Sequence, residues 1–143
     1  TRTVLEIYRD LGRIMWDKVG MARSDQSLKD AITKIKALRD EFYKGFKMPQ
    51  DMNDMNMDLE LAGRVADFLE LGDLMARDAL QRKESCGGHF RTESQTPEGE
   101  AQRNDDDYCY AAAWEHKGEG QDPVMHKEQL NFEYIKLAQR SYK

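Results

Sequence analysis

The sequence has 143 residues, which is long enough for one domain with its own core, because a chain of this size buries roughly two-thirds of its unfolded surface. Charged residues make up 34% and hydrophobic residues 39%, and the net charge of -5 without a basic stripe excludes a typical nucleic-acid-binding domain. No apolar run approaches the roughly 18 residues of a membrane span, nothing at the start resembles a signal peptide, and two cysteines are too few for a disulfide framework.

The first predicted helix runs from the N-terminus to Gly20. The chain begins without Met inside this helical sequence, so we expect it to be a piece of a longer polypeptide. Apolar residues recur in steps of three and four, as they do on the buried face of an amphipathic helix. They are Val4, Tyr8, Leu11, Met15 and Val19, with Ile7 and Ile14 beside them. We also expect Trp16 to be a packing anchor.

Two further helices follow. Ser24 or Asp25 can cap the second, which ends at Gly45. The third is predicted over residues 55–83 with Asp54 as its cap. The apolar face of the second helix is Leu28, Ile32, Ile35, Leu38 and Phe42, and that of the third is Leu59, Ala62, Val65, Ala66, Leu69, Met75, Ala76, Ala79 and Leu80. Short connections between amphipathic helices favour an antiparallel up-down-up bundle over residues 1–83, similar to a spectrin repeat.

From Glu84 onward the helical period is lost, and residues 84–143 are predicted to be an extended C-terminal tail that packs on the bundle or on domains outside this sequence. An irregular polar segment comes first. "YCYAAAWEHK" then favours a strand with Trp114 as an anchor, "GEGQDP" favours a turn, and a second strand continues through the alternating Leu130, Phe132 and Tyr134. The predicted fold class is therefore mainly α, a three-helix bundle followed by an irregular segment and a short β-hairpin.

Cysteine and histidine occur at two places where zinc could be considered. Cys86 and His89 are three residues apart, and Cys109 and His116 are seven apart. Neither pair has the tight spacing of a structural zinc knuckle, and the second pair would point to opposite faces of a strand. A nucleophilic Cys86 assisted by His89 is disfavoured, because it would lie at the negative end of a helix dipole.

The glycine pair and two kinds of side-chain cluster have structural explanations. Gly87 and Gly88 are expected to form a left-handed helix C-cap. The clusters are the aspartates Asp51, Asp54 and Asp58, the aspartates of residues 105–107, and the methionines Met48, Met52, Met55 and Met57. The aspartates lack the spacing of a calcium loop, and methionines favour packing against a neighbouring surface over copper binding. The residues therefore predict no catalytic, cofactor-binding or metal-binding site.

The stretch "RKESCGGHFR" at residues 82–91 resembles the signature "R-x-E-S-R-G-x-H-x-R" of the flavoprotein subunits of succinate dehydrogenases and fumarate reductases, and L-aspartate oxidase has a similar segment. The matching residues are Arg82, Glu84, Ser85, Gly87, His89 and Arg91. "LGRIMWDKVGMARS", "NDDDY" and "FEYIKLAQRSYK" are also similar to that family, so the resemblance covers nearly the whole chain. Cys86 stands where the family usually has arginine, which removes a bidentate donor, and Gly88 is smaller than the usual residue.

The resemblance implies a non-catalytic C-terminal domain, inactive alone and without a cofactor of its own. FAD and the residues that handle the substrate would belong to the preceding FAD-binding and capping domains of the parent oxidoreductase. The six matching residues would dock on the flavin domain, and the domain would support assembly with an iron-sulfur subunit on the cytoplasmic face of the cell membrane, without membrane insertion. The alternative is a free-standing helical interaction module, with a structural zinc site at Cys86, His89, Cys109 and His116.

Overall fold

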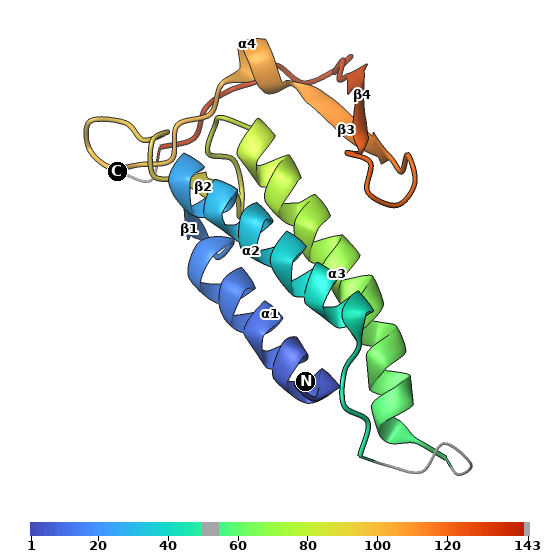
Figure 1. Cartoon of the computed structure of the whole chain (residues 1–143). Helices are drawn as coiled ribbons and strands as arrows, with labels where there is room; N and C mark the ends of the chain where they lie inside the picture. Colours follow the sequence, from blue (N-terminus) through green and yellow to red (C-terminus); the bar gives the residue numbers. More distant parts are fainter. Residues whose placement is uncertain (50–54, 142–143) are drawn as a thin grey trace. The chain divides into compact units, whose positions relative to one another are not determined.

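The structure is a computed structural model that describes residues 1–49 and 55–141. The chain divides into two compact units, Thr1–Gln81 and Arg82–Lys143. In chain order the elements are α1 (Val4–Lys18), β1 (Ala22–Arg23), α2 (Asp25–Lys44), α3 (Met57–Gln81), β2 (Phe90–Arg91), α4 (Asp105–Tyr108), β3 (Tyr110–Glu115) and β4 (Val124–Gln129) (Figure 1).

The first two helices begin at side chains that bind their exposed amides. At α1 the hydroxyl of Thr3 accepts a hydrogen bond from the Glu6 amide (3.3 Å), and the Glu6 carboxylate accepts one from the Thr3 amide (2.8 Å). Ser24, one of the two predicted caps, caps α2 through a reciprocal pair of hydrogen bonds with Ser27. These capping boxes satisfy amides that have no partner inside the helix.

Helix α3 is shorter than predicted at both ends. The side-chain oxygen of Asn56 accepts hydrogen bonds from the amides of Asp58 (3.0 Å) and Leu59 (3.1 Å), so Asn56 is the cap and the helix begins at Met57. The predicted cap Asp54 lies outside the described residues. In the described ranges, no helix is both long and apolar enough to cross a membrane.

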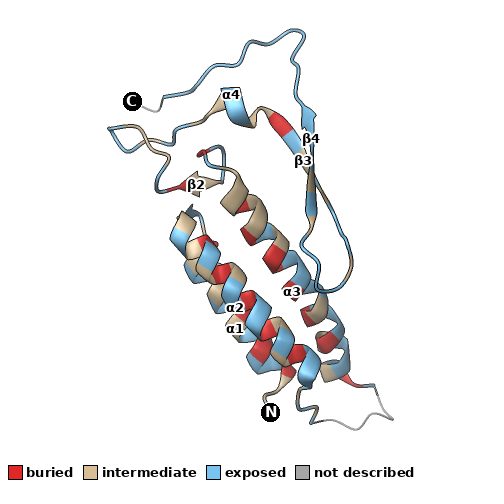
Figure 2. Cartoon of the chain, turned by 45° about the horizontal axis from the view of Figure 1, so that its top comes forward, coloured by how far each residue is buried: buried red, intermediate tan, exposed pale blue. Residues whose placement is uncertain are grey.

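The first unit is the predicted up-down-up bundle, and its core is formed where the three helices face one another (Figures 1 and 2). The buried side chains are Val4, Ile7, Leu11, Val19, Leu28, Ala31, Ile35, Leu38, Phe42, Ala62, Val65, Leu69, Ala76 and Ala79. Alanines in α3 allow close approach of the neighbouring helices. The predicted three-helix architecture is confirmed.

The predicted apolar faces were too wide in some places. Tyr8 is 41%, Leu59 47% and Met75 49% exposed, and Trp16, which was expected to be a packing anchor, is 84% exposed. Those predictions are wrong, because each helix of a three-helix bundle meets neighbours on one side only. Side chains at the shoulder of the apolar stripe therefore stay in solvent.

The second unit contains the predicted hairpin. Strands β3 and β4 pair antiparallel, from Tyr110 opposite Gln129 to Glu115 opposite Val124. Trp114 is half-buried. The expected continuation of the second strand is wrong, since β4 ends at Gln129 and Phe132 and Tyr134 are exposed outside any strand. The physical reason is that the chain before β3 turns into α4, so that no partner strand remains beyond that point.

Candidate functional site

Arg82 is the first residue after α3 and the centre of a polar cluster in the second unit. Its Nη1 donates hydrogen bonds to Oε1 of Glu84 (2.8 Å) and to the carbonyl of Tyr108 (3.0 Å), and its Nη2 donates to the carbonyl of Tyr110 (3.2 Å). The guanidinium carbon also lies 5.8 Å and 5.0 Å from the ring centres of Tyr108 and Tyr110. Arginine suits this place because its planar fork can bind several acceptors while it stacks on aromatic faces.

Glu84 extends the cluster to the segment before α4. The residue is only 2% exposed, and its second oxygen accepts a hydrogen bond from the Asn104 amide (2.8 Å). A buried carboxylate is tolerated only when its charge is paired and its oxygens are satisfied. Arg82 and Asn104 meet both requirements, so Glu84 joins parts of the chain that are twenty residues apart.

Ser85 and Arg91, in the same segment, are hydrogen-bonded to each other. The Ser85 hydroxyl accepts a hydrogen bond from the Arg91 amide (2.8 Å) and donates one to the Arg91 carbonyl (3.2 Å), and the Ser85 amide donates to the carbonyl of Gln102 (2.8 Å). Ser85 and Arg91 are 2% and 3% exposed. The Arg91 Nε donates to the carboxylate of Glu93 (3.3 Å). These contacts fix the path of the chain on both sides of the glycine pair.

The glycine pair forms a tight turn and not the predicted helix cap. The Cys86 amide donates to the His89 carbonyl (2.8 Å) and the His89 amide donates to the Cys86 carbonyl (3.0 Å), with Gly87 and Gly88 between them. Gly87 has a φ of 58° and Gly88 does not have a positive φ, and positive φ at the first central position alone is the pattern of a type II′ turn. The cap prediction is wrong because α3 already ends at Gln81, before the polar cluster begins.

The side chains that were considered for chemistry have other contacts. Nε2 of His89 is 2.8 Å from the carbonyl oxygen of Arg82, so this nitrogen carries the hydrogen and donates it. Cys86 is exposed at the turn, and the Cys109 sulfur lies 3.8 Å from the carbonyl oxygen of Leu130. In the part of the chain that the structure describes, no three His, Cys, Asp or Glu side chains are grouped so that they could hold a metal ion. The zinc alternative therefore depends on the sequence alone.

The acidic residues of α4 take part in local contacts. Both oxygens of Asp105 accept hydrogen bonds from Arg103, at 2.5 and 2.7 Å, and this arginine holds the pKa of the Asp105 carboxyl below its usual value. Asn104 caps the short helix by accepting from the Asp107 amide (3.3 Å). Among the methionines and the other aspartates, Met55 and Met57 are exposed, whereas Asp51, Met52 and Asp54 lie outside the described residues.

The structure thus brings five of the six predicted docking residues into one internally bonded segment, with Gly87 at its turn. Whether this segment docks on another domain remains a prediction. Sequence reasoning missed the partners Asn104, Tyr108 and Tyr110. The available signal was the pair of tyrosines two residues apart, because aromatic rings are common neighbours of a guanidinium.

A family model described as "Fumarate reductase flavoprotein C-term" matches residues 8–142. The chain is similar to the L-aspartate oxidase of Vibrio cholerae, with 30% identity over 86 residues that make up 58% of this chain and 14% of the relative. It is also similar to the fumarate reductase flavoprotein of Haemophilus influenzae, with 30% identity over 86 residues, 60% of this chain and 14% of the relative.

A solved structure has the same fold over nearly the whole chain. It is described as a quinol-fumarate reductase with menaquinol molecules, and it matches with a TM-score of 0.80 at 21% identity. The match covers 95% of this chain but only 22% of the other chain. The present sequence therefore corresponds to a small part of each of these proteins.

Proposed function

Because the chain belongs to the family of C-terminal domains of fumarate reductase flavoproteins, we propose that it is the non-catalytic packing and assembly domain of a longer, FAD-dependent succinate or fumarate oxidoreductase. One observation carries this proposal. The family match extends over residues 8–142, whereas the aligned part makes up only 14% of the L-aspartate oxidase and 14% of the fumarate reductase flavoprotein. In such a protein, FAD and the substrate would be bound by the preceding FAD-binding and capping domains.

The segment 82–91 would be the docking element on the flavin domain. Arg82, Glu84 and Ser85 are engaged in hydrogen bonds within the second unit, so they would shape this element more than they reach out of it. Its exposed tip, from Cys86 to Gly88, would make the contact. A turn that is already ordered loses little conformational entropy on docking, which favours binding.

The parent protein would work next to an iron-sulfur subunit on the cytoplasmic face of the cell membrane. One finding supports a place at a membrane: a solved structure of the same fold is described as a quinol-fumarate reductase with menaquinol molecules. The domain would then take part in assembly without entering the bilayer.

The test compares the parent polypeptide, expressed from the open reading frame that contains this sequence, with the 143-residue chain. We expect the parent to be purified with the visible absorbance of a flavin and to oxidise succinate with a dye acceptor, and the shorter chain to do neither. Oxidation of L-aspartate in place of succinate would assign the parent to the other group of relatives. Flavin binding or turnover by the 143-residue chain itself would overturn the non-catalytic role.

A further inference from the structure

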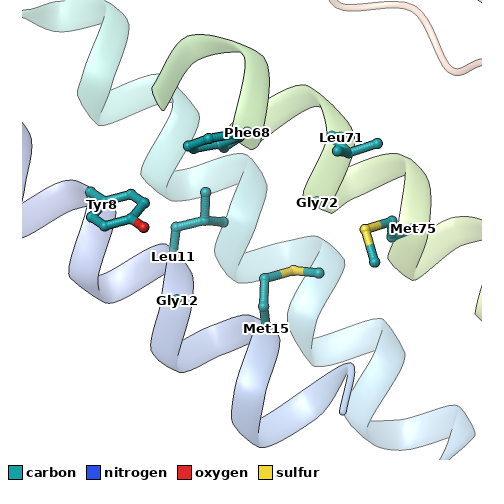
Figure 3. A pocket seen from close by; sticks show the side chains of 8 residues that line it. All are labelled: Tyr8, Leu11, Gly12, Met15, Phe68, Leu71, Gly72 and Met75. Atoms are coloured by element: carbon teal, nitrogen blue, oxygen red, sulfur yellow. The ribbon is translucent and has the colours of Figure 1, made fainter. Parts of the chain in front are cut away.

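An open apolar groove runs between α1 and α3 on the bundle. Figure 3 shows the side chains of Tyr8 and Phe68 next to each other at one end and those of Met15 and Met75 at the other. The groove is lined by Tyr8, Leu11, Gly12, Met15, Phe68, Leu71, Gly72 and Met75. None of these eight residues is charged, and the rings of Tyr8 and Phe68 are 6.1 Å apart.

Two glycines keep the groove open. A Cβ atom on Gly72 would come within 3.2 Å of the Met15 sulfur and 3.5 Å of a Leu11 methyl group, so any larger residue would fill the floor. A Cβ atom on Gly12 would have no neighbour within 4 Å, so this glycine lines the groove where it is open to solvent. The depression between the two helices is therefore a consequence of the sequence.

The groove fits protein side chains better than a small molecule. Its volume is about 280 Å³, just below the roughly 300–1,000 Å³ of typical ligand pockets. Ligand pockets also carry several polar groups that fix the orientation of the ligand. Here the Tyr8 hydroxyl is the one side-chain polar group among the eight lining residues. An occupant that contributes aliphatic or aromatic side chains matches this chemistry.

The apolar surface extends beyond the groove itself. Leu5 and Trp16 lie three residues before Tyr8 and four after Gly12, so they share that side of α1. Trp16 is 84%, Leu71 53%, Met75 49% and Leu5 39% exposed. With Tyr8 (41%) and Phe68 (38%), these six side chains expose roughly 500–600 Å², when an area of about 200 Å² for each is scaled by its exposed fraction. A patch of this size is at the upper end of what a typical monomer exposes, and such patches often contact a partner.

We propose that the α1/α3 groove is the surface by which this domain packs on the rest of its own parent polypeptide, and that its occupant is an apolar helix or loop from outside the present sequence. This inference depends on the proposed function. The matched part makes up only 14% of the L-aspartate oxidase and 22% of the solved structure's chain. Most of a parent polypeptide of that length would therefore lie outside the present sequence and be available to cover the patch. Counting both sides, the contact would bury about 1,000–1,200 Å², within the range of interfaces between domains of one chain and well below the roughly 2,000 Å² or more of obligate homodimers.

The test is hydroxyl-radical footprinting of the 143-residue chain and of the parent polypeptide, with each residue compared to itself. We expect oxidation of Trp16 and Met75 to be about tenfold slower in the parent, because their exposure would fall from 84% and 49% to the buried range. Tyr43 on α2, 63% exposed, is the matched control and should react equally in both proteins. Equal reactivity of Trp16 and Met75 in the two proteins would overturn the proposal.

A pair of substitutions gives a second readout. Leu71→Glu places a charge in the groove at a residue that is 53% exposed, so it should leave the melting temperature of the 143-residue chain unchanged and lower that of the parent by several degrees. Tyr43→Glu should change neither. Unchanged melting of the Leu71→Glu parent would contradict the inference.

Two further outcomes separate this inference from its alternatives. Protection of Trp16 that disappears on dilution, together with a dimer in sedimentation, would identify a second copy as the occupant and would overturn the proposal. A parent polypeptide that is protected at the groove but contains no flavin would refute the proposed function and leave the packing surface intact. A parent with flavin and an exposed groove would refute the packing surface alone.

Discussion

Replacement of Glu84 by alanine should loosen the second unit of the free chain. The mutation removes the acceptor of two hydrogen bonds, from Arg82 (2.8 Å) and from the Asn104 amide (2.8 Å), at a residue that is 2% exposed. Loss of one partner of a buried, hydrogen-bonded ion pair costs about 3–5 kcal/mol. We expect the lower end of this range, because Arg82 keeps the carbonyls of Tyr108 and Tyr110 as acceptors. Glu84→Gln, which keeps an oxygen for the Asn104 amide, should cost only about 1–2 kcal/mol.

Native-state hydrogen exchange is the suitable assay, because it reports local opening of each unit. The reporters are the amides of Ser85 and Gln102, which donate to the carbonyls of Gln102 and Ser94 and not to the Glu84 carboxylate. A loss of about 3 kcal/mol accelerates their exchange by about 10²-fold. Glu60→Ala is the control, since its ion pair with Arg64 is half exposed and contributes only about 0.3–0.5 kcal/mol. If Glu84→Ala accelerates these amides no more than Glu60→Ala does, the carboxylate does not organise the segment.

Three further predictions follow from the glycines and from the acidic residues of the bundle. In urea titrations, Gly87→Ala should lower the free energy of unfolding by about 1 kcal/mol, because the φ of Gly87 is 58°. Gly88→Ala, at a position without positive φ, is the control and should change it by less than about 0.5 kcal/mol. Gly20→Ala should lower the melting temperature, because the added Cβ would lie 2.6 Å from the Trp16 carbonyl oxygen. Gly63→Ala in α3 should instead raise the free energy of unfolding by about 0.5–1 kcal/mol, because its Cβ would have no neighbour within 4 Å. A stabilising Gly20→Ala would contradict the structure. Hydrogen bonding to Lys18, and less strongly to Lys34, lowers the pKa of Asp30 in the folded state, so its stabilising contribution is present above the unfolded pKa near 4 and is lost as the pH falls through the folded pKa. Asp30→Asn should therefore make the melting temperature of the chain less sensitive to acid below about pH 4, and an unchanged pH profile would show that this pair is not formed in solution.

The bundle could be predicted because its signals are local. Apolar residues at steps of three and four locate the helices, and Ser24 marks the start of α2 by its hydrogen-bonding capacity. The same period does not tell how wide the buried stripe is. Trp16 lies beside the apolar stripe of α1 and is nevertheless 84% exposed, because a helix of the bundle meets its neighbours on one side only. Of the four side chains whose burial was wrongly predicted, Tyr8 and Met75 line the groove, whereas Leu59 and Trp16 do not.

The polar cluster could not be predicted because its contacts have no period. Arg82 reaches Tyr108 and Tyr110 across 26 and 28 residues, and Glu84 reaches Asn104 across 20. The sequence between these partners is polar and irregular, so rules based on propensity indicate only a surface loop. The resemblance to a family motif pointed to Arg82 and Glu84, but as docking residues and not as partners in an internal cluster. The second half depends on a chain path that only the structure shows.

The cysteine at position 86 can be understood from the same geometry. Cys86 contributes its backbone amide and carbonyl to the turn with His89, at 2.8 and 3.0 Å, and its side chain is exposed. An arginine at this position, as in the signature that the segment resembles, would form the same turn, because neither hydrogen bond involves the side chain. The internal contacts of Glu84 and Ser85 are likewise independent of the side chain at position 86. The fold of the segment therefore does not depend on the family arginine, and the change to cysteine alters only the surface that the turn presents to whatever it contacts.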